Sequence, residues 1–205
     1  VQPQSDFKDG RGNYVDRLAA WLRTEYPQRE VIVAGREEPA EARPGQVVVV
    51  KAGVGGDTTA GGLKRLEKDV LARKPDLVTV MFGVNDENRR GDSNAVPPAE
   101  FRGNLERIVQ AALDAGGAVI VLTPGMKNPG WSATVGNMAE FAEAARAVAA
   151  EKQICLVDNY YAWELVGKRG YSSMVFLGNC INHPVDLAHE QKFWGLRSAI
   201  AEPSN

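Results

Sequence analysis

The fold is decided by Asp76-Leu77-Val78-Thr79-Val80-Met81-Phe82-Gly83-Val84-Asn85-Asp86, a stretch near the middle of the chain. Its apolar run over 77–82, broken only by Thr79, is typical of a strand that is buried on both faces. The run ends in small and polar residues over 83–86, and open α/β sheets bind their ligands beyond the carboxyl ends of their strands. Asn85 could donate its amide to a substrate oxygen there, although Gly, Asn and Asp also form plain turns.

Similar apolar runs lie on both sides of this stretch, and helical patterns separate them. Because strands that alternate with helices form parallel sheets covered on both faces, we expect a three-layer α/β/α fold with a mainly parallel sheet. We expect it to form a single domain over 1–205. The predicted strands are 30–34, 47–50, 77–82, 118–122 and 154–157; the predicted helices are 13–26, 60–73, one after Pro98, one around 138–148, 160–166 and 187–200.

Composition excludes several classes of protein. The 205 residues are 44% apolar and carry a net charge of −2, which argues against a nucleic-acid protein that works through a basic field. No apolar stretch is long enough to span a bilayer, and no signal peptide opens the sequence. A processed precursor would look the same, so the compartment, cytoplasmic or secreted after signal removal, stays open. Cys155 and Cys180 do not make a disulfide framework, and Cys155 fits a small core position.

Both histidines of the chain, His183 and His189, lie within seven residues of each other and beside Asp186. A neutral imidazole can take a proton from a hydroxyl near pH 7, and a carboxylate can orient the ring. The alternative is the start of a surface helix, with Asp186 as its cap and both histidines in solvent. The segment is therefore a candidate site for a general base.

A second candidate site is the glycine-rich corner over 53–62. It lacks the spacing of a dinucleotide loop, because Thr58 occupies the place of the third glycine, and no Gly-Lys-Ser/Thr follows for a phosphate loop. Glycine here favours instead the close approach of a backbone N–H to a reacting oxygen at a helix N-terminus. That is the geometry of an oxyanion hole.

Two blocks together resemble the SGNH (GDSL-type) hydrolases, a family of esterases and lipases with a flavodoxin-like fold. The residues over 51–58 (Lys-Ala-Gly-Val-Gly-Gly-Asp-Thr) are similar to the second block of the family, and 82–86 (Phe-Gly-Val-Asn-Asp) to the third. The resemblance implies that the Gly56 N–H and the Asn85 side chain bind the oxyanion and that His183, before Pro184, is the general base. It also implies a short-chain acyl ester as substrate, with no cofactor and no metal.

The first block departs from the family pattern, Gly-Asp-Ser-x-x-x-Gly after a strand. The corresponding stretch is Gln4-Ser5-Asp6-Phe7-Lys8-Asp9-Gly10, without a recognisable strand before it. Gapless spacing puts Asp6 at the nucleophile, whereas one inserted residue puts Ser5 there. We expect Ser5 to be the nucleophile, because a carboxylate would place a fixed negative charge against the oxyanion hole.

The block near the carboxyl terminus also departs from the family pattern. The family has Asp three residues before its His, and here Cys180 occupies that position before His183. The pair Asp186–His189 is the alternative to His183.

The expected function is a serine ester hydrolase that acts through an acyl-enzyme. A catalytically impaired relative that binds acyl or carbohydrate ligands is the alternative; acyl length, alcohol and oligomeric state stay open.

Overall fold

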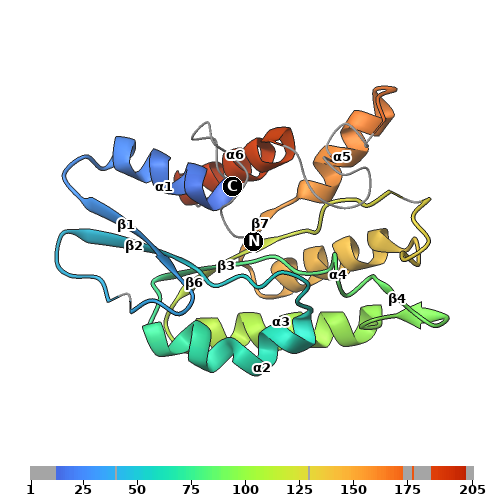
Figure 1. The fold of residues 1–205 in the computed structure, drawn as a ribbon, viewed down its shortest axis with the longest axis horizontal. Coiled ribbons are helices and arrows are strands. Elements are labelled where there is room, and N and C mark those ends of the chain that lie inside the picture. The colour runs from blue at the N-terminus through green and yellow to red at the C-terminus, as the bar shows by residue number, and fades with distance from the viewer. Residues whose placement is uncertain (1–12, 40, 129, 173–176, 178–185, 202–205) are drawn as a thin grey trace.

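The structure is a computed structural model that describes residues 13–39, 41–128, 130–172, 177 and 186–201. Helices and strands alternate along the chain as the sequence predicts (Figure 1). The main elements are α1 (Tyr14–Glu25), β1 (Glu30–Gly35), β2 (Gln46–Lys51), α2 (Thr59–Asp69), β3 (Leu77–Val80), α3 (Pro98–Asp114), β6 (Ala118–Leu122), α4 (Met138–Glu151), β7 (Cys155–Val157), α5 (Asn159–Lys168) and α6 (Asp186–Ala201). Shorter elements are the 3₁₀ turn η1 (Leu71–Arg73) and the strands β4 (Arg89–Arg90) and β5 (Ser93–Asn94).

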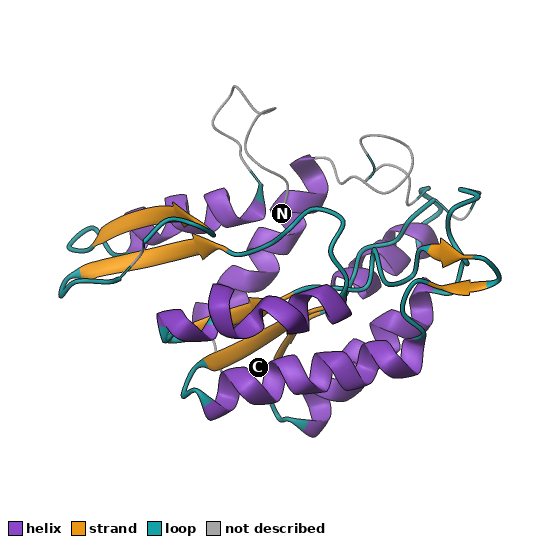
Figure 2. Cartoon of the chain, turned by 60° about the horizontal axis from the view of Figure 1, so that its bottom comes forward, coloured by secondary structure: helices purple, strands orange, loops and turns teal. Residues whose placement is uncertain are grey.

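The main strands pair in parallel, in two groups. β1 pairs with β2, with Val31 opposite Val47, while β3, β6 and β7 form a three-stranded sheet in that order. In that sheet Val78 lies opposite Val119 and Val121 opposite Leu156. Among the described strands, no pairing joins β2 to β3. Figure 2 shows the two groups of strands and the helices around them.

Strand β6 shows why the fold has three layers. Val119 and Val121 pack into one core cluster with residues of α3 and α4, whereas the alternate residues Ile120 and Leu122 pack into a second cluster with α1 and α6. Because side chains alternate across a strand, the two clusters lie on opposite faces of the sheet. Figure 1 shows α3 and α4 on one side of the strands and α1 and α6 on the other. The predicted α/β/α fold with a mainly parallel sheet is confirmed.

The prediction for the deciding strand was wrong in one respect. β3 ends at Val80 rather than at residue 82, and Leu77, which is 38% exposed, and Thr79 face away from the core that holds Val78 and Val80. Among the described strands β3 pairs only with β6. The strand whose side chains are buried on both faces is β6. An apolar run reports hydrophobicity, and it does not report which faces of a strand are covered.

Local signals explain where most helices begin and end. The Asn13 side chain caps α1, as predicted, by accepting from the backbone N–H groups of Val15 (3.0 Å) and Asp16 (3.3 Å). α2 stops at Asp69, earlier than predicted, and the following turn ends at Lys74 in a left-handed conformation (φ 49°). The loop predicted after the third strand contains the hairpin β4–β5.

Among the described residues, none of the helices combines the length and the apolar character that a membrane span needs.

Candidate active site

Two loops, one after β2 and one after β3, meet at the start of α2. The Asn85 side chain, after β3, donates from Nδ2 to the backbone oxygen of Asp57, after β2, over 2.9 Å. A side-chain amide has two N–H hydrogens, and among the described residues Nδ2 makes no second hydrogen bond. The contact therefore places a donor beside residues 56 and 57 with one hydrogen left for a ligand.

Gly56 lies in a tight turn in which the Asp57 N–H donates to the Val54 oxygen over 3.3 Å. Its φ of +75° is a conformation that side chains other than glycine rarely adopt, although a Cβ there would meet open space. Gly56 is exposed, and its backbone N–H donates no hydrogen bond within the described part of the chain. Glycine is therefore required for the path of the backbone in this turn. The Gly56 N–H, which has no partner within the described part of the chain, is open to a ligand.

The helix that follows adds a favourable field. α2 begins at Thr59, and the Thr58 hydroxyl caps it by accepting from the Gly61 N–H over 3.4 Å. The N-terminus of a helix carries partial positive charge from its free N–H groups, which favours negative charge placed beside it. An oxyanion near Gly56 and Asn85 would lie next to this end of α2.

Asp86 holds the loop after β3 to the same helix. Its buried carboxylate accepts from the Thr59 N–H (2.8 Å), the Thr59 hydroxyl (2.5 Å) and the Gly83 N–H (3.1 Å). Burial raises the pKa of Asp86 above its ordinary value, and the hydrogen bonds from Thr59 and Gly83 offset only part of this rise. Because Asp86 directly follows Asn85, its bonds fix the backbone from which the Asn85 amide projects.

A buried ion pair ties a third loop to the site. Lys127, after β6, contacts Glu87 with 2.7 Å between Nζ and Oε2, and their side chains are 2% and 0% exposed. Lys127 also donates to Asn88 Oδ1 (2.8 Å), while Glu87 accepts from the Thr134 hydroxyl and from the Gly136 N–H (2.6 Å). Burial lowers the pKa of Lys127, against the opposing effect of Glu87. The pair fastens the loop over 123–137 to the segment that carries Asn85.

A third carboxylate, Asp158, follows β7 and stabilises the frame of the fold. It caps α5 through the Tyr161 N–H (3.0 Å) and accepts from the Thr123 hydroxyl (3.0 Å) and from Arg146 (2.7 and 3.2 Å). Burial acts to raise the pKa of Asp158, but the bonds from Arg146, Tyr161 and Thr123 lower it overall. With these partners in place, Asp158 fixes the junction between β7, α4 and α5.

The structure brings together some of the predicted site residues and leaves others untested. Gly56 and Asn85 lie in adjacent loops, as described above. Ser5, Asp6 and His183 fall outside the described residues. Asp186 and His189 belong to α6, and their side chains lie outside the described part of the structure. Among the described residues, no group of three or more His, Cys, Asp or Glu is placed to hold a metal ion.

Sequence reasoning missed the charged side chains that support the site. The Glu87–Lys127 pair joins residues 40 apart, and no local pattern reveals such a contact. Arg65 of α2 contacts Asp57 over 2.7 Å. The sequence signal for an ion pair of Arg65 is its spacing of four residues from Asp69, and nothing in that spacing indicates the contact with Asp57.

The named relatives match only part of the chain. The chain is 39% identical over 74 residues to Esterase TesA of Pseudomonas aeruginosa, which is 36% of this chain and 34% of that protein. It is 33% identical over 76 residues to an arylesterase of Vibrio mimicus (37% and 36%). An acetylxylan esterase of Geobacillus stearothermophilus is 33% identical over 81 residues (37% and 37%). The matches thus span about a third of the length of these relatives.

Solved structures with the same fold cover much more of the chain. Axe2, an acetylxylan esterase of G. stearothermophilus, superposes with a TM-score of 0.71 at 24% identity, over 92% of this chain and 81% of that one. The lipase/acylhydrolase of Enterococcus faecalis gives 0.64 at 25% identity, over 86% and 99%. These likenesses show a shared fold.

The family model of the GDSL-like lipases and acylhydrolases matches residues 3–190. This match confirms the resemblance that the blocks over 51–58 and 82–86 indicated. The chain belongs to the GDSL-like Lipase/Acylhydrolase family.

Proposed function

We propose that the protein is a carboxylic ester hydrolase that cleaves short-chain acyl esters through an acyl-enzyme. The observation that carries the proposal is the 2.9 Å bond from Asn85 Nδ2 to the Asp57 oxygen, which holds a side-chain amide beside the exposed Gly56 N–H at the start of α2. Donors aimed at a developing oxyanion are the largest single contribution to many acyl-transfer reactions. Membership of the family and the esterase names of its relatives support the same reaction.

In the proposed reaction Ser5 Oγ attacks the ester carbonyl carbon while His183 takes the hydroxyl proton. The carbonyl oxygen becomes an oxyanion that accepts from the Gly56 N–H, the Asn85 Nδ2–H and the Ser5 N–H. The bond to the alcohol oxygen then breaks, and His183 returns its proton to that oxygen. Water, deprotonated by His183, attacks the acyl-enzyme and releases the acid and the free Ser5 hydroxyl.

The proposed substrate is an ester of a short acid, such as an acetyl group on a sugar or a small alcohol. Its support is the resemblance of the sequence blocks and the name acetylxylan esterase among the relatives. In the proposal Ser5 rather than Asp6 is the nucleophile, because attack by a carboxylate would form an anhydride and leave a negative charge facing the oxyanion donors.

Labelling with a fluorophosphonate, followed by peptide mass mapping, tests the nucleophile. We expect modification at Ser5, none in Ser5→Ala, and full labelling in Asp6→Asn. Modification at the exposed Ser132 would move the nucleophile to the loop after β6. A folded protein that neither reacts with the probe nor hydrolyses p-nitrophenyl acetate would refute the esterase and favour an impaired relative that binds acyl or carbohydrate ligands.

A further inference from the structure

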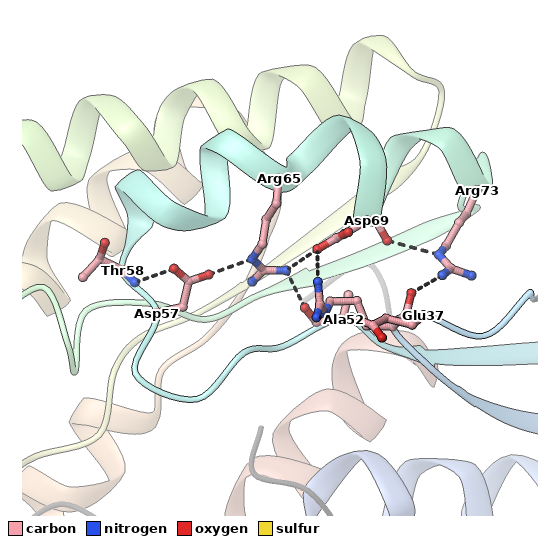
Figure 3. Close-up of polar contacts among 8 residues, drawn as sticks. Glu37, Ala52, Asp57, Thr58, Arg65, Asp69 and Arg73 are labelled. Carbon is pink, nitrogen blue, oxygen red and sulfur yellow. Dashed lines mark hydrogen bonds and ion pairs between the residues drawn. The ribbon is translucent and has the colours of Figure 1, made fainter.

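Arg65 of α2 contacts Asp57, Ala52 and Asp69 (Figure 3). Its Nε donates to Asp57 Oδ2 over 2.7 Å, and its Nη1 donates to the Ala52 oxygen over 2.6 Å and to Asp69 Oδ2 over 3.3 Å. The Arg65 and Asp57 side chains are only 21% and 14% exposed. Charged hydrogen bonds with so little solvent around them are stronger and more rigid than exposed ones.

These contacts hold both ends of an exposed loop. Ala52 follows β2 directly, Asp57 precedes the cap of α2, and the residues between them, 53–56, are exposed. A loop with little packing of its own takes its conformation from the groups that fix its ends. A single guanidinium that binds both ends therefore sets the path of the backbone through Gly56.

Asp57 extends this influence to the second oxyanion donor. Its carboxylate binds Arg65 and accepts from the Thr58 N–H over 3.0 Å, while its backbone oxygen accepts from Asn85 Nδ2. The orientation of Asp57 thus determines both the peptide that follows Gly56 and the partner that orients the Asn85 amide. Resting on the proposed function, we propose that Arg65, acting through Asp57, is the positioning residue of the oxyanion hole.

A second observation, at Gly61, supports the proposal independently. A Cβ at Gly61 would lie 1.9 Å from Asp57 Oδ1, so the carboxylate of Asp57 rests against the first turn of α2 only because this residue is glycine. Glycine inside a helix is otherwise unfavourable compared with alanine. The chain thus carries a poor helix former at the one place where a side chain would displace Asp57.

Asp69 holds Arg65 from the other side. Its buried carboxylate also accepts from Arg36 Nη1 over 3.2 Å. Burial acts to raise the pKa of Asp69, but the bonds from Arg36 and Arg65 lower it below its ordinary value, so the carboxylate stays charged. Arg65 is thereby locked between two carboxylates, and its geometry is set before a substrate arrives.

The test compares Arg65→Met and Gly61→Ala with matched controls on α3, using p-nitrophenyl acetate. The controls are Arg102→Met, which removes an arginine that pairs with Glu106 and Glu151 on the surface, and Gly103→Ala, whose Cβ meets nothing within 4 Å. We expect kcat to fall about 10–100-fold in both Arg65→Met and Gly61→Ala, with KM within about twofold, because a misplaced donor weakens only the transition state. Both controls keep the wild-type kcat.

Two further measurements separate positioning from simple loss of structure. In Gly61→Ala the preference of alanine for the helix opposes the loss of the Asp57 contacts, so we expect a protein that stays folded at the assay temperature, and circular dichroism under assay conditions separates a loss of kcat from unfolding. In an Asn85→Ala background Arg65→Met should cost less than it does alone, since one donor is already gone. Wild-type kcat in Gly61→Ala and Arg65→Met, beside a low kcat in Asn85→Ala, overturns the inference and leaves the proposed function standing. Absence of turnover in the wild type overturns both.

Discussion

The buried pair of Glu87 and Lys127 allows a sharp test of how the loops around the site are held. Glu87 Oε2 lies 2.7 Å from Lys127 Nζ, and neither side chain has appreciable contact with solvent. Replacing Glu87 by Gln leaves a buried ammonium without its counter-charge, and such losses cost about 3–5 kcal/mol. Gln has a single acceptor oxygen, so it can accept from the Gly136 N–H or from Lys127 but not from both, and we expect Glu87→Gln to lower the free energy of unfolding by about 3–5 kcal/mol.

Urea unfolding measures this change directly. Because the cost comes from the unpaired charge, adding Lys127→Met to Glu87→Gln should restore about 1–2 kcal/mol, although a second core mutation would ordinarily destabilise further. The matched control is Arg102→Met on the surface, where the side chain is 42% exposed, and the expected loss of stability is much smaller than in Glu87→Gln. A Glu87→Gln variant no less stable than Arg102→Met, or a double variant less stable than Glu87→Gln alone, would refute the reasoning.

Three further predictions concern the site and the core. Asn85→Ala should lower kcat for p-nitrophenyl acetate about 10²–10³-fold with little change in melting temperature, because it removes one oxyanion donor; an unchanged kcat would contradict the site. His183→Ala should abolish turnover while His189→Ala keeps most of it, and the reverse result would assign the base to His189. Burial lowers the pKa of Lys192 to about 8, so the unfolded chain binds more protons above that pH, and the free energy of unfolding should rise by about 2 kcal/mol from pH 8 to 10. Urea unfolding should show a smaller rise in Lys192→Met, because Lys127, whose pKa burial also lowers, remains. Tyr14, whose pKa burial raises to about 12, opposes the rise only above pH 10.

The sequence predicted the layers of the fold because their signals are local. The apolar run that became β6 and the cap at Asn13 each lie within a few residues, and both were found where they were expected. The end of β3 at Val80 and its pairing with β6 were not predicted, because strand order depends on which segments pair, and hydrophobicity alone does not report pairing. For the same reason the run over 77–82 appeared more buried than Leu77 is.

The candidate site was predictable where a residue type carries its own chemistry. Gly56 needs its left-handed conformation and Asn85 offers an amide at a strand end, and both signals are visible in the residues themselves. The supporting contacts were not predictable. Glu87 reaches Lys127 across 40 residues, and Arg65 binds the oxygen of Ala52 from a different element. Such contacts depend on the packed structure, in which loops from separate strands come together.

Both loops of the candidate site are anchored on α2. Among the described strands β2 and β3 do not pair directly with each other. α2 binds each loop separately: its first residue, Thr59, donates twice to Asp86, and Arg65, less than two turns later, binds Asp57. One helix thus carries an anchor for each loop, and the bond from Asn85 to Asp57 joins the two loops directly. We therefore expect a change that moves α2 to shift the two proposed oxyanion donors together, whereas a change at Arg65 should shift one relative to the other and lower turnover more.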